Sequence, residues 1–411
     1  MTMDEEVSSD QPRSLRDLLR LTLTPDLGPV LIARLLEHFG TAATVLGKSS
    51  SALAAVRGIG SVKADAIARG LAASDELATT EIEACEQLGV RLISLADNEY
   101  PALLKTIPSA PPLLYIKGTL EPATLDQYPC AIVGSRNCTA YGIEQAERFG
   151  GFLGRSGITI VSGGAYGIDA AAHRGALRAQ GRTIAVLGCG LAKCYPPEHK
   201  ELFEEIAQHG AVVSELPLDT SPNPANFPAR NRIISGMSLG VVVIEAQRRS
   251  GALITARLAA EDHAREVFAL PGRVDSAASE GSLDLIKQGG AIMVTEPADV
   301  LAALESPARH HHEGTHEARY QADDPVMQAV LFDPQAGETQ RTTHAPKAPS
   351  VPRIGVTPAQ QAILDALSSS LTLDQLQSQT GRPVSELRGD LTVLEIQKMV
   401  VREGSVFRTR R

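Results

Sequence analysis

The chain has 411 residues, with 39 Lys and Arg against 48 Asp and Glu, so its formal net charge is −9 at pH 7. Hydrophobic residues make up 43% of it, which excludes wholesale disorder, and the length corresponds to about two or three domains. The acidic balance argues against a histone-like protein that coats nucleic acid through bulk charge, but it permits a local basic site. Aromatic residues reach 4% and Trp is absent, so an aromatic base-stacking platform is not expected.

Cysteine usage and hydropathy predict a cytoplasmic protein. The number of cysteines, five, is odd and there is no Cys-x-x-Cys pair, which disfavours a secreted disulfide framework. The N-terminus is acidic and polar, unlike a signal peptide, and no apolar run approaches ~18 residues, so no membrane span is expected.

Short helices are predicted for residues 14–77, after a polar tail at 1–13. Two segments resemble each other, because each begins near a Gly and then carries small or apolar residues at helical spacing: LGPVLIARLLEHFG (27–40) and IGSVKADAIARG (59–70). Gly58-Ile59-Gly60 has the form of a helix-hairpin-helix turn, where backbone N–H groups can meet a phosphate near Lys63. A lone Gly-x-Gly turn is weak evidence, so packing within a SAM-like or helix-hairpin-helix-like module is favoured.

Residues 78–304 are predicted to form an extended Rossmann-like domain. Its first part, 78–128, reads as a covering segment with a helix, one apolar strand (90–95) and a Pro-rich run. From 129 onwards, short β-branched runs bounded by Gly alternate with helical patterns, which is typical of a parallel sheet buried on both faces. The strand candidates are CAIVG (130–134), ITIVSG (158–163), TIAVLG (183–188), AVVSE (211–215), GVVVIEA (240–246), EVFALPG (266–272) and AIMVTE (291–296). The fold class is therefore α/β, with a Rossmann-like doubly wound parallel sheet.

Two further segments complete the chain. Residues 305–355 lose periodicity, and the histidines 310–312 and 316 lie in low-complexity sequence without supporting ligands, so a flexible linker is favoured over a metal site. Residues 356–411 pattern as three helices and two short strands, a winged helix whose second helix opens after Thr372. Seven Lys and Arg against six Asp and Glu from Thr357 give a net charge of +1, too balanced to decide between DNA contact and protein docking.

Ligands of doubly wound sheets bind beyond the carboxyl ends of the strands, so the residues there are the first candidates for a site. Small residues, hydroxyls and an arginine ahead of a helix N-terminus suit a phosphate. Such residues are Gly134, Ser135, Arg136 and Asn137 after the first strand, and Ser162, Gly163 and Gly164 after the second. Neither loop reads G-x-G-x-x-G, so no dinucleotide site is predicted.

The densest basic signal is NFPARNRII (226–234), where Arg230 and Arg232 flank Asn231 and Phe227 is placed either to stack on a base or to pack in the core. Lys193, Lys200 and Arg273 lie on further strand tips. Several anion-binding loops without a nucleophile or metal cluster favour binding of a polyanion over its turnover. Neither a metal nor a cofactor is predicted.

Catalytic alternatives rest on a few titratable residues. Asp169 and His173 stand at i,i+4 and would form an acid/base pair, although a capping and packing role is favoured. Cys189 and Cys194 lack a histidine base in the same motif. Glu215 and Glu245 follow strands, and each could bind a metal or cap a helix.

The motifs AIVGSRNCTAYG, IVSGGAYGIDAAAHRGAL, NFPARNRIISGMS and VVVIEAQRRSGALITARLAAE, in this order, resemble the DNA-processing protein A (DprA/Smf) family. The resemblance covers the whole Rossmann-like domain, and the outer modules match the extended family layout less strictly. It implies a recombination mediator in natural transformation that binds incoming single-stranded DNA, forms a homodimer through the Rossmann-like domain, and loads RecA. Residues 282–290 (SLDLIKQGG) are dimer candidates on the same ground.

Carried over by position, the family's DNA pocket corresponds to the 134–136 and 162–164 loops and to Arg230 and Arg232. The family often has a lysine after the Tyr-Pro pair, where this chain has Pro197, so Lys193 and Lys200 are candidate substitutes. Replacing Arg136 or Arg232 with Ala is expected to weaken binding and flatten its salt dependence. Two alternatives remain. One is a nucleotide hydrolase of the phosphoribohydrolase type using Glu245 or Asp169, although its Pro-Gly-Gly-x-Gly-Thr loop is absent, and the other is a winged-helix transcription regulator.

Overall fold

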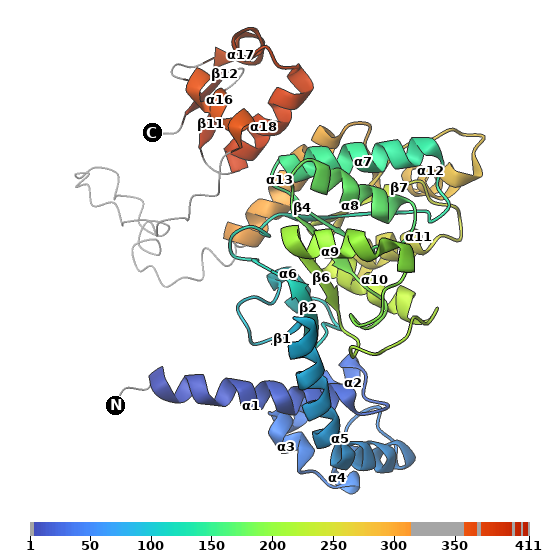
Figure 1. Cartoon of the computed structure of the whole chain (residues 1–411). Helices are drawn as coiled ribbons and strands as arrows, with labels where there is room; N and C mark the ends of the chain where they lie inside the picture. Colours follow the sequence, from blue (N-terminus) through green and yellow to red (C-terminus); the bar gives the residue numbers. More distant parts are fainter. Residues whose placement is uncertain (1–3, 314–356, 368–370, 397–398, 404–405, 410–411) are drawn as a thin grey trace, which may run out of the picture. The chain divides into compact units, whose positions relative to one another are not determined.

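The computed structural model describes residues 4–313, 357–367, 371–396, 399–403 and 406–409. The chain falls into two compact units, one up to Val300 and one from Leu301 onwards (Figure 1). None of the described helices is long and apolar enough to cross a membrane.

Five helices open the chain: α1 (Asp4–Leu23), α2 (Pro29–Phe39), α3 (Ala42–Leu46), α4 (Ser50–Ala54) and α5 (Ser61–Leu88). α1 begins inside the segment predicted as a polar tail, and the predicted boundary at residue 77 falls inside α5. Apolar side chains of these helices, such as Leu35 and Ile67, are buried together with Leu113 and Tyr115 of the adjoining sheet. The helical module and the sheet edge therefore share one hydrophobic core.

A nine-stranded sheet forms the centre of the first unit, in the order β1-β2-β6-β5-β4-β3-β7-β8-β9. Its strands are β1 (Arg91–Ser94), β2 (Leu113–Gly118), β3 (Pro129–Gly134), β4 (Thr159–Ser162), β5 (Thr183–Val186), β6 (Gly210–Ser214), β7 (Gly240–Ile244), β8 (Glu266–Ala269) and β9 (Ile292–Met293). β3 to β9 correspond to the seven predicted strands and all pair in parallel, which confirms the predicted fold class. β1 and β2 add an antiparallel hairpin at the β6 edge, so the predicted covering segment is part of the sheet.

Helices cover both faces of the parallel strands (Figure 1). They are α6 (Ala102–Lys105), α7 (Ala140–Arg155), α8 (Ile168–Arg178), α9 (Lys200–His209), α10 (Asn226–Gly236), α11 (Gly251–Arg257), which continues as a π-helical turn to Asp262, and α12 (Glu280–Lys287). Because side chains alternate along a strand, Ile184 of β5 packs in the core that includes α10 and α11, while Ala185 packs against α8 and α9. Both faces of the central parallel strands are therefore buried.

α7 and α8 pack closely because glycines stand at their contact. A Cβ on Gly150 would run into the carbonyl oxygen of Ala172, and a Cβ on Gly175 into that of Glu147. α7 begins at the cap residue Thr139, whose hydroxyl accepts the Gly142 N–H at 3.3 Å. This start fixes where the loop after β3 ends.

The second unit contains most of α13 (Pro297–Glu313), then α16 (Pro358–Ala366), α17 (Leu373–Thr380) and α18 (Val384–Ile396), with the strands β10 (Leu371–Thr372), β11 (Val400–Glu403) and β12 (Val406–Thr409). The last three helices and the three-stranded sheet form the predicted winged helix, and Thr372 caps α17 as expected. Arg382 in the turn pairs with Asp390 of α18 at 2.7 Å. Histidines 310–312 fall at the end of α13, and residues 314–355 of the predicted linker lie outside the described residues, as do His316, Arg410 and Arg411.

Candidate nucleic-acid interface

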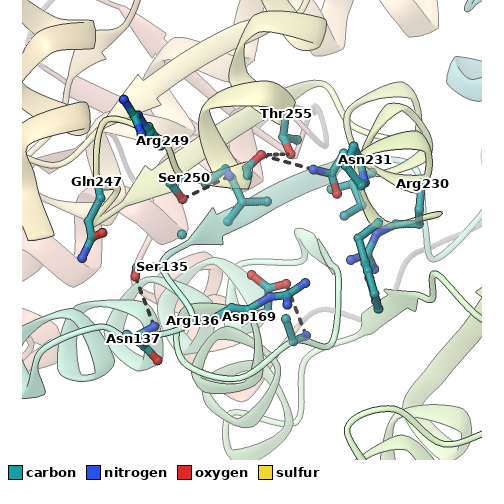
Figure 2. A pocket seen from close by; sticks show the side chains of 18 of the residues that line it. Ser135, Arg136, Asn137, Asp169, Arg230, Asn231, Gln247, Arg249, Ser250 and Thr255 are labelled. Carbon is teal, nitrogen blue, oxygen red and sulfur yellow. Dashed lines mark hydrogen bonds between the residues drawn. The ribbon is translucent and has the colours of Figure 1, made fainter. Parts of the chain in front are cut away.

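A cleft of about 460 Å³ opens where the connections of the sheet change direction. β3 lies between β4 on one side and β7 on the other. The loops that leave β3 and β7 therefore diverge and expose a crevice between them. Figure 2 shows that most of the labelled lining residues come from the β3–α7 loop, α10 and the β7–α11 loop, while Asp169 lies on α8 and Thr255 on α11. Parallel strands thus bring together segments about a hundred residues apart in sequence.

The β3–α7 loop forms one wall. The Asn137 N–H donates to the Ser135 hydroxyl at 3.2 Å, which turns the backbone just after the strand. The Ser135 N–H donates to the carbonyl oxygen of Glu245 at 2.8 Å, tying this loop to the end of β7. Arg136 and Asn137 are exposed, and the Arg136 guanidinium lies over the Phe227 ring, 5.0 Å from its centroid. The loop therefore presents an arginine at the rim of the cleft.

Arg230 reaches the cleft from α10, but its guanidinium is mostly turned inward. Its Nη1 donates to the carbonyl oxygen of Gly163 at 2.7 Å and to that of Val186, and the side chain is 4% exposed. Its Nε has no hydrogen-bond partner within the described structure. The neighbouring Asn231 donates to the Gly251 carbonyl oxygen at 3.2 Å, so α10 is also linked to the start of α11 (Figure 2).

Asp169 is the carboxylate that lines the cleft, next to Arg230. Burial raises the pKa of Asp169, and the Arg230 charge opposes that shift. Burial lowers the pKa of Arg230 to about 10, so the guanidinium stays protonated at neutral pH. Gly163 packs between these two groups, where a Cβ would lie 2.6 Å from both the Arg230 Nη2 and the Asp169 Oδ2. The floor of the cleft thus holds a buried guanidinium beside a buried carboxyl group.

Uncompensated positive charge comes from the two rims. Arg136 on one wall and Arg249 on the other have no ion pair among the described residues, and both are exposed. Arg248, adjacent to Arg249, instead pairs with Asp284 at 2.9 Å. The Tyr195 ring lies 5.4 Å from that of Phe227, so two of the scarce aromatic residues stand at the Arg136 side.

Seven of the predicted site residues line this cleft: Gly134, Ser135, Arg136, Asn137, Phe227, Arg230 and Asn231. Gly163 lines a narrow adjoining pocket beside Arg136, whereas Ser162 and Gly164 are buried and do not line either. The Ser162 hydroxyl donates to the Ile132 carbonyl oxygen at 2.6 Å.

Four predicted cations are not among the lining residues. Arg232 forms two hydrogen bonds with the Glu215 carboxylate, at 2.6 and 2.8 Å, and its Nε donates to the Ser109 carbonyl oxygen at 3.0 Å. Lys193 pairs with Asp219 at 2.5 Å, and Arg273 pairs with Asp275 at 2.8 Å. Lys200 is exposed at the start of α9. Their contact with a ligand stays a prediction.

The residues of the catalytic alternatives have separate structural partners. Asp169 accepts the Ala165 N–H at 3.4 Å, while the His173 Nδ1 lies 2.7 Å from the Thr183 hydroxyl. Burial lowers the pKa of His173 to about 3 and raises that of the Cys189 thiol to about 11, so neither titrates near neutral pH. Within the part of the chain that the structure describes, no three His, Cys, Asp or Glu side chains are grouped to hold a metal ion.

One wall of the cleft, formed by Gln247, Arg249, Ser250 and Thr255, is not among the predicted site residues, although the sequence places Arg249 and Ser250 at a strand tip. Arg249 and Ser250 follow a predicted strand, which is a usable signal. Their approach to Arg136 depends on β7 lying beside β3, and the strand order is not encoded in any local pattern.

Comparison with known proteins gives consistent results. A family model described as DNA recombination-mediator protein A matches residues 91–305, and one described as the DprA winged helix domain matches residues 344–404. Protein Smf of Synechocystis sp. is 37% identical over 391 residues, which cover 94% of this chain and 96% of the relative. DNA processing protein DprA of Streptococcus pneumoniae is 45% identical over 213 residues, covering 52% of this chain and 73% of the relative.

A solved structure agrees with the sequence relatives. The X-ray structure of DNA processing protein A from Streptococcus pneumoniae superposes with a TM-score of 0.61 at 35% identity, covering 70% of this chain and 97% of that one. The family-model match over residues 91–305 spans the parallel sheet and the loops that form the cleft in this chain. Sequence, domain order and fold therefore agree that the chain belongs to the DprA/Smf family of DNA recombination-mediator proteins.

Proposed function

We propose that the cleft between the β3–α7 and β7–α11 loops binds single-stranded DNA through its phosphates. The observation that supports this most directly is the pair of exposed arginines on its two walls, Arg136 and Arg249, neither of which has an ion pair with a described residue. An arginine fork matches phosphate geometry, and a local concentration of positive charge attracts a polyanion even when the whole chain is acidic. Binding is then expected to be largely indifferent to base sequence.

A single strand suits this cleft better than a duplex. Its volume of about 460 Å³ is that of a small-ligand pocket, which admits a splayed nucleotide. A duplex keeps its bases stacked inside. It would therefore contact the rims of the cleft without placing a base in it. Phe227 and Tyr195 offer ring surface at the Arg136 side on which an unstacked base can rest.

The binding test compares three arginine variants by fluorescence anisotropy with a labelled oligo-dT. Arg136→Ala and Arg249→Ala are each expected to weaken binding about tenfold and to reduce the slope of log affinity against log salt by about 0.7, because each removes one phosphate contact. Arg248→Ala is the matched control, since its side chain pairs with Asp284. Unchanged affinity in the Arg136→Ala, Arg249→Ala double variant would overturn the proposal.

We further propose that this chain acts as a homodimer in the cytoplasm. In this role it delivers the bound DNA strand to RecA during natural transformation. Family membership supports a mediator role, and the exposed apolar strand β9 supports pairing of two copies at that edge of the sheet. The test is the rate of RecA filament growth on DNA coated with single-strand-binding protein. Acceleration by the wild-type chain and its loss in the double variant are expected, and equal rates with and without the chain would contradict the role.

A hydrolase would need an acid free to act in the cleft. Asp169 is engaged by a backbone N–H and lies beside Arg230, and both carboxylate oxygens of Glu245 accept hydrogen bonds from Thr139. Neither arrangement favours a general acid or base, so we retain the binding role. Release of free base from nucleoside monophosphates would favour the hydrolase instead.

A further inference from the structure

We infer that Glu245 is a positioning residue that fixes the β3–α7 loop and thereby holds Arg136 at the cleft. Glu245 directly follows β7 and is 4% exposed. It is not among the residues that line the cleft, so it acts on a ligand through the loop that it holds. The inference rests on the proposed function in one respect, namely that Arg136 contacts DNA.

Three hydrogen bonds attach this loop to Glu245. The Thr139 N–H donates to the Glu245 Oε2 at 2.8 Å, and the Thr139 hydroxyl donates to Oε1 at 2.6 Å. At the other end of the loop, the Ser135 N–H donates to the Glu245 carbonyl oxygen at 2.8 Å. Arg136 and Asn137 lie between these two attachment points. One residue therefore fixes both ends of the segment that carries the rim arginine.

The backbone of Glu245 is itself held in an unusual conformation. Its φ of 45° lies in the left-handed region, which non-glycine residues adopt rarely and keep where the surroundings impose it. The next residue, Ala246, accepts the Gly281 N–H at 2.7 Å and donates to the Ser282 hydroxyl at 3.1 Å. The start of α12 thus supports the turn from behind. The backbone of Glu245 is therefore held in place on both sides, and the β3–α7 loop is bonded to it.

The space around the carboxylate is fitted to this role. Gly142, in the first turn of α7, leaves room that a side chain would fill, because a Cβ there would collide with the Glu245 carboxylate. The carboxylate accepts from one N–H and one O–H, and charge-assisted hydrogen bonds of this kind are short and strong. A neutral amide of the same shape would keep both partners, because its oxygen accepts the Thr139 N–H and its NH₂ group donates to the Thr139 hydroxyl, so the test needs an apolar side chain of similar size.

The first experiment measures the loop directly by hydrogen exchange in the full-length chain. In Glu245→Met the amides of Ser135 and Thr139 are expected to exchange about tenfold faster, since both side-chain hydrogen bonds to Thr139 are lost. Thr139→Ser keeps both donors and should exchange like wild type. If Glu245→Met does not fold, Thr139→Val, which removes the hydroxyl alone, takes its place. Unchanged exchange in the folded variant overturns the inference.

The second experiment tests whether the effect of Glu245 on DNA binding depends on Arg136. Glu245→Met is expected to weaken oligo-dT binding about threefold to tenfold in the wild-type background and much less in the Arg136→Ala background, because the two changes affect one contact. Asp126→Leu is the matched control, since it also replaces a buried carboxylate with an apolar side chain. This buried carboxylate pairs with Arg182 and bonds Thr159, the first residue of β4, at the opposite end of the strands, so its loss should lower stability without altering the loop.

The outcomes separate the two proposals. An equal loss of binding in both backgrounds means that Glu245 does not act through Arg136 and overturns the inference. If Arg136→Ala binds like wild type, the proposed function of that arginine fails. The exchange rates of Ser135 and Thr139 still decide whether Glu245 holds the loop.

Discussion

At mildly acidic pH, His173 is protonated in the unfolded chain and neutral in the folded chain. Its side chain is fully buried in α8, Nδ1 lies 2.7 Å from the Thr183 hydroxyl, and Nε2 has no partner within the described structure. Burial, with the nearby charges of His199, Arg230 and Arg174, lowers its pKa to about 3 from an ordinary value near 6.5. The unfolded state therefore binds more protons between these two values, and stability falls as the pH drops through this window.

The expected result is a loss of roughly 2 kcal/mol of unfolding free energy between pH 6.5 and pH 5 that is specific to His173. Asp169, whose pKa is raised by burial, works in the opposite direction just above its ordinary value of 3.8, so the comparison must be made between variants. Urea denaturation at the two pH values is compared for wild type and His173→Asn. Equal pH dependence in both chains would show that His173 is not the group responsible.

Residue chemistry was predictable from the sequence, but charge pairing was not. Arg136 and Asn137 follow a clear strand and stand at the rim as expected. Arg232 belongs to an equally suggestive motif, yet its guanidinium is engaged by Glu215. Glu215 follows β6 and Arg232 lies on α10, so their meeting depends on packing. A sequence shows which side chains carry charge, and packing decides which of them remain free.

At the scale of elements, periodicity located every parallel strand, because each is a short β-branched run bounded by Gly. It missed β2, whose sequence directly follows a Pro-rich run. It also could not supply the order that places β7 beside β3, and this order creates the cleft. The loops were thus predictable one by one, while the wall formed by the β7–α11 loop depends on tertiary structure.

The α7–α8 contact allows a prediction at this scale. Alanine is the better helix former by about 1 kcal/mol, but a Cβ on Gly175 would run into the Glu147 carbonyl oxygen of the facing helix. Gly175→Ala is therefore expected to destabilise the chain by about 1–3 kcal/mol, as overpacking does in cores. Gly251→Ala, at the start of α11 where nothing lies within 4 Å of the added Cβ, is the control and should be neutral or slightly stabilising. Thermal unfolding measures both, and equal melting temperatures would refute the packing argument.

For the whole molecule, the net charge of −9 and the cleft are compatible because many arginines are neutralised locally. Arg91 pairs with Glu99, Arg178 with Glu147, and Arg182 with Asp126. Such pairs leave an acidic surface that limits nonspecific adhesion to nucleic acid, whereas Arg136 and Arg249 keep their charge available at the cleft. Affinity for a polyanion then depends on a few positions and not on total charge.

The far edge of the sheet determines the proposed oligomeric state. β9 is two residues long, ends the strand order, and exposes Ile292 and Met293 at 47% and 56%. An exposed apolar edge strand is a template for pairing with another chain, and monomeric proteins usually protect such edges with charge. Leu285 and Ile286 of α12, both half-buried, lie within the candidate dimer segment 282–290. Edge and helix together offer apolar surface to a second copy.

A charge placed on this edge should therefore separate the copies. Met293→Asp is expected to convert a dimer of the wild-type chain into a monomer, because an aspartate would be desolvated without a partner on pairing. Size-exclusion chromatography with light scattering measures the mass directly. Val62→Asp, at a site 84% exposed on the N-terminal module, is the matched control and should remain dimeric, since it adds the same charge far from β9. A Met293→Asp chain that stays dimeric would show that the copies pair elsewhere, and a monomeric wild type would remove the dimer from the proposed function.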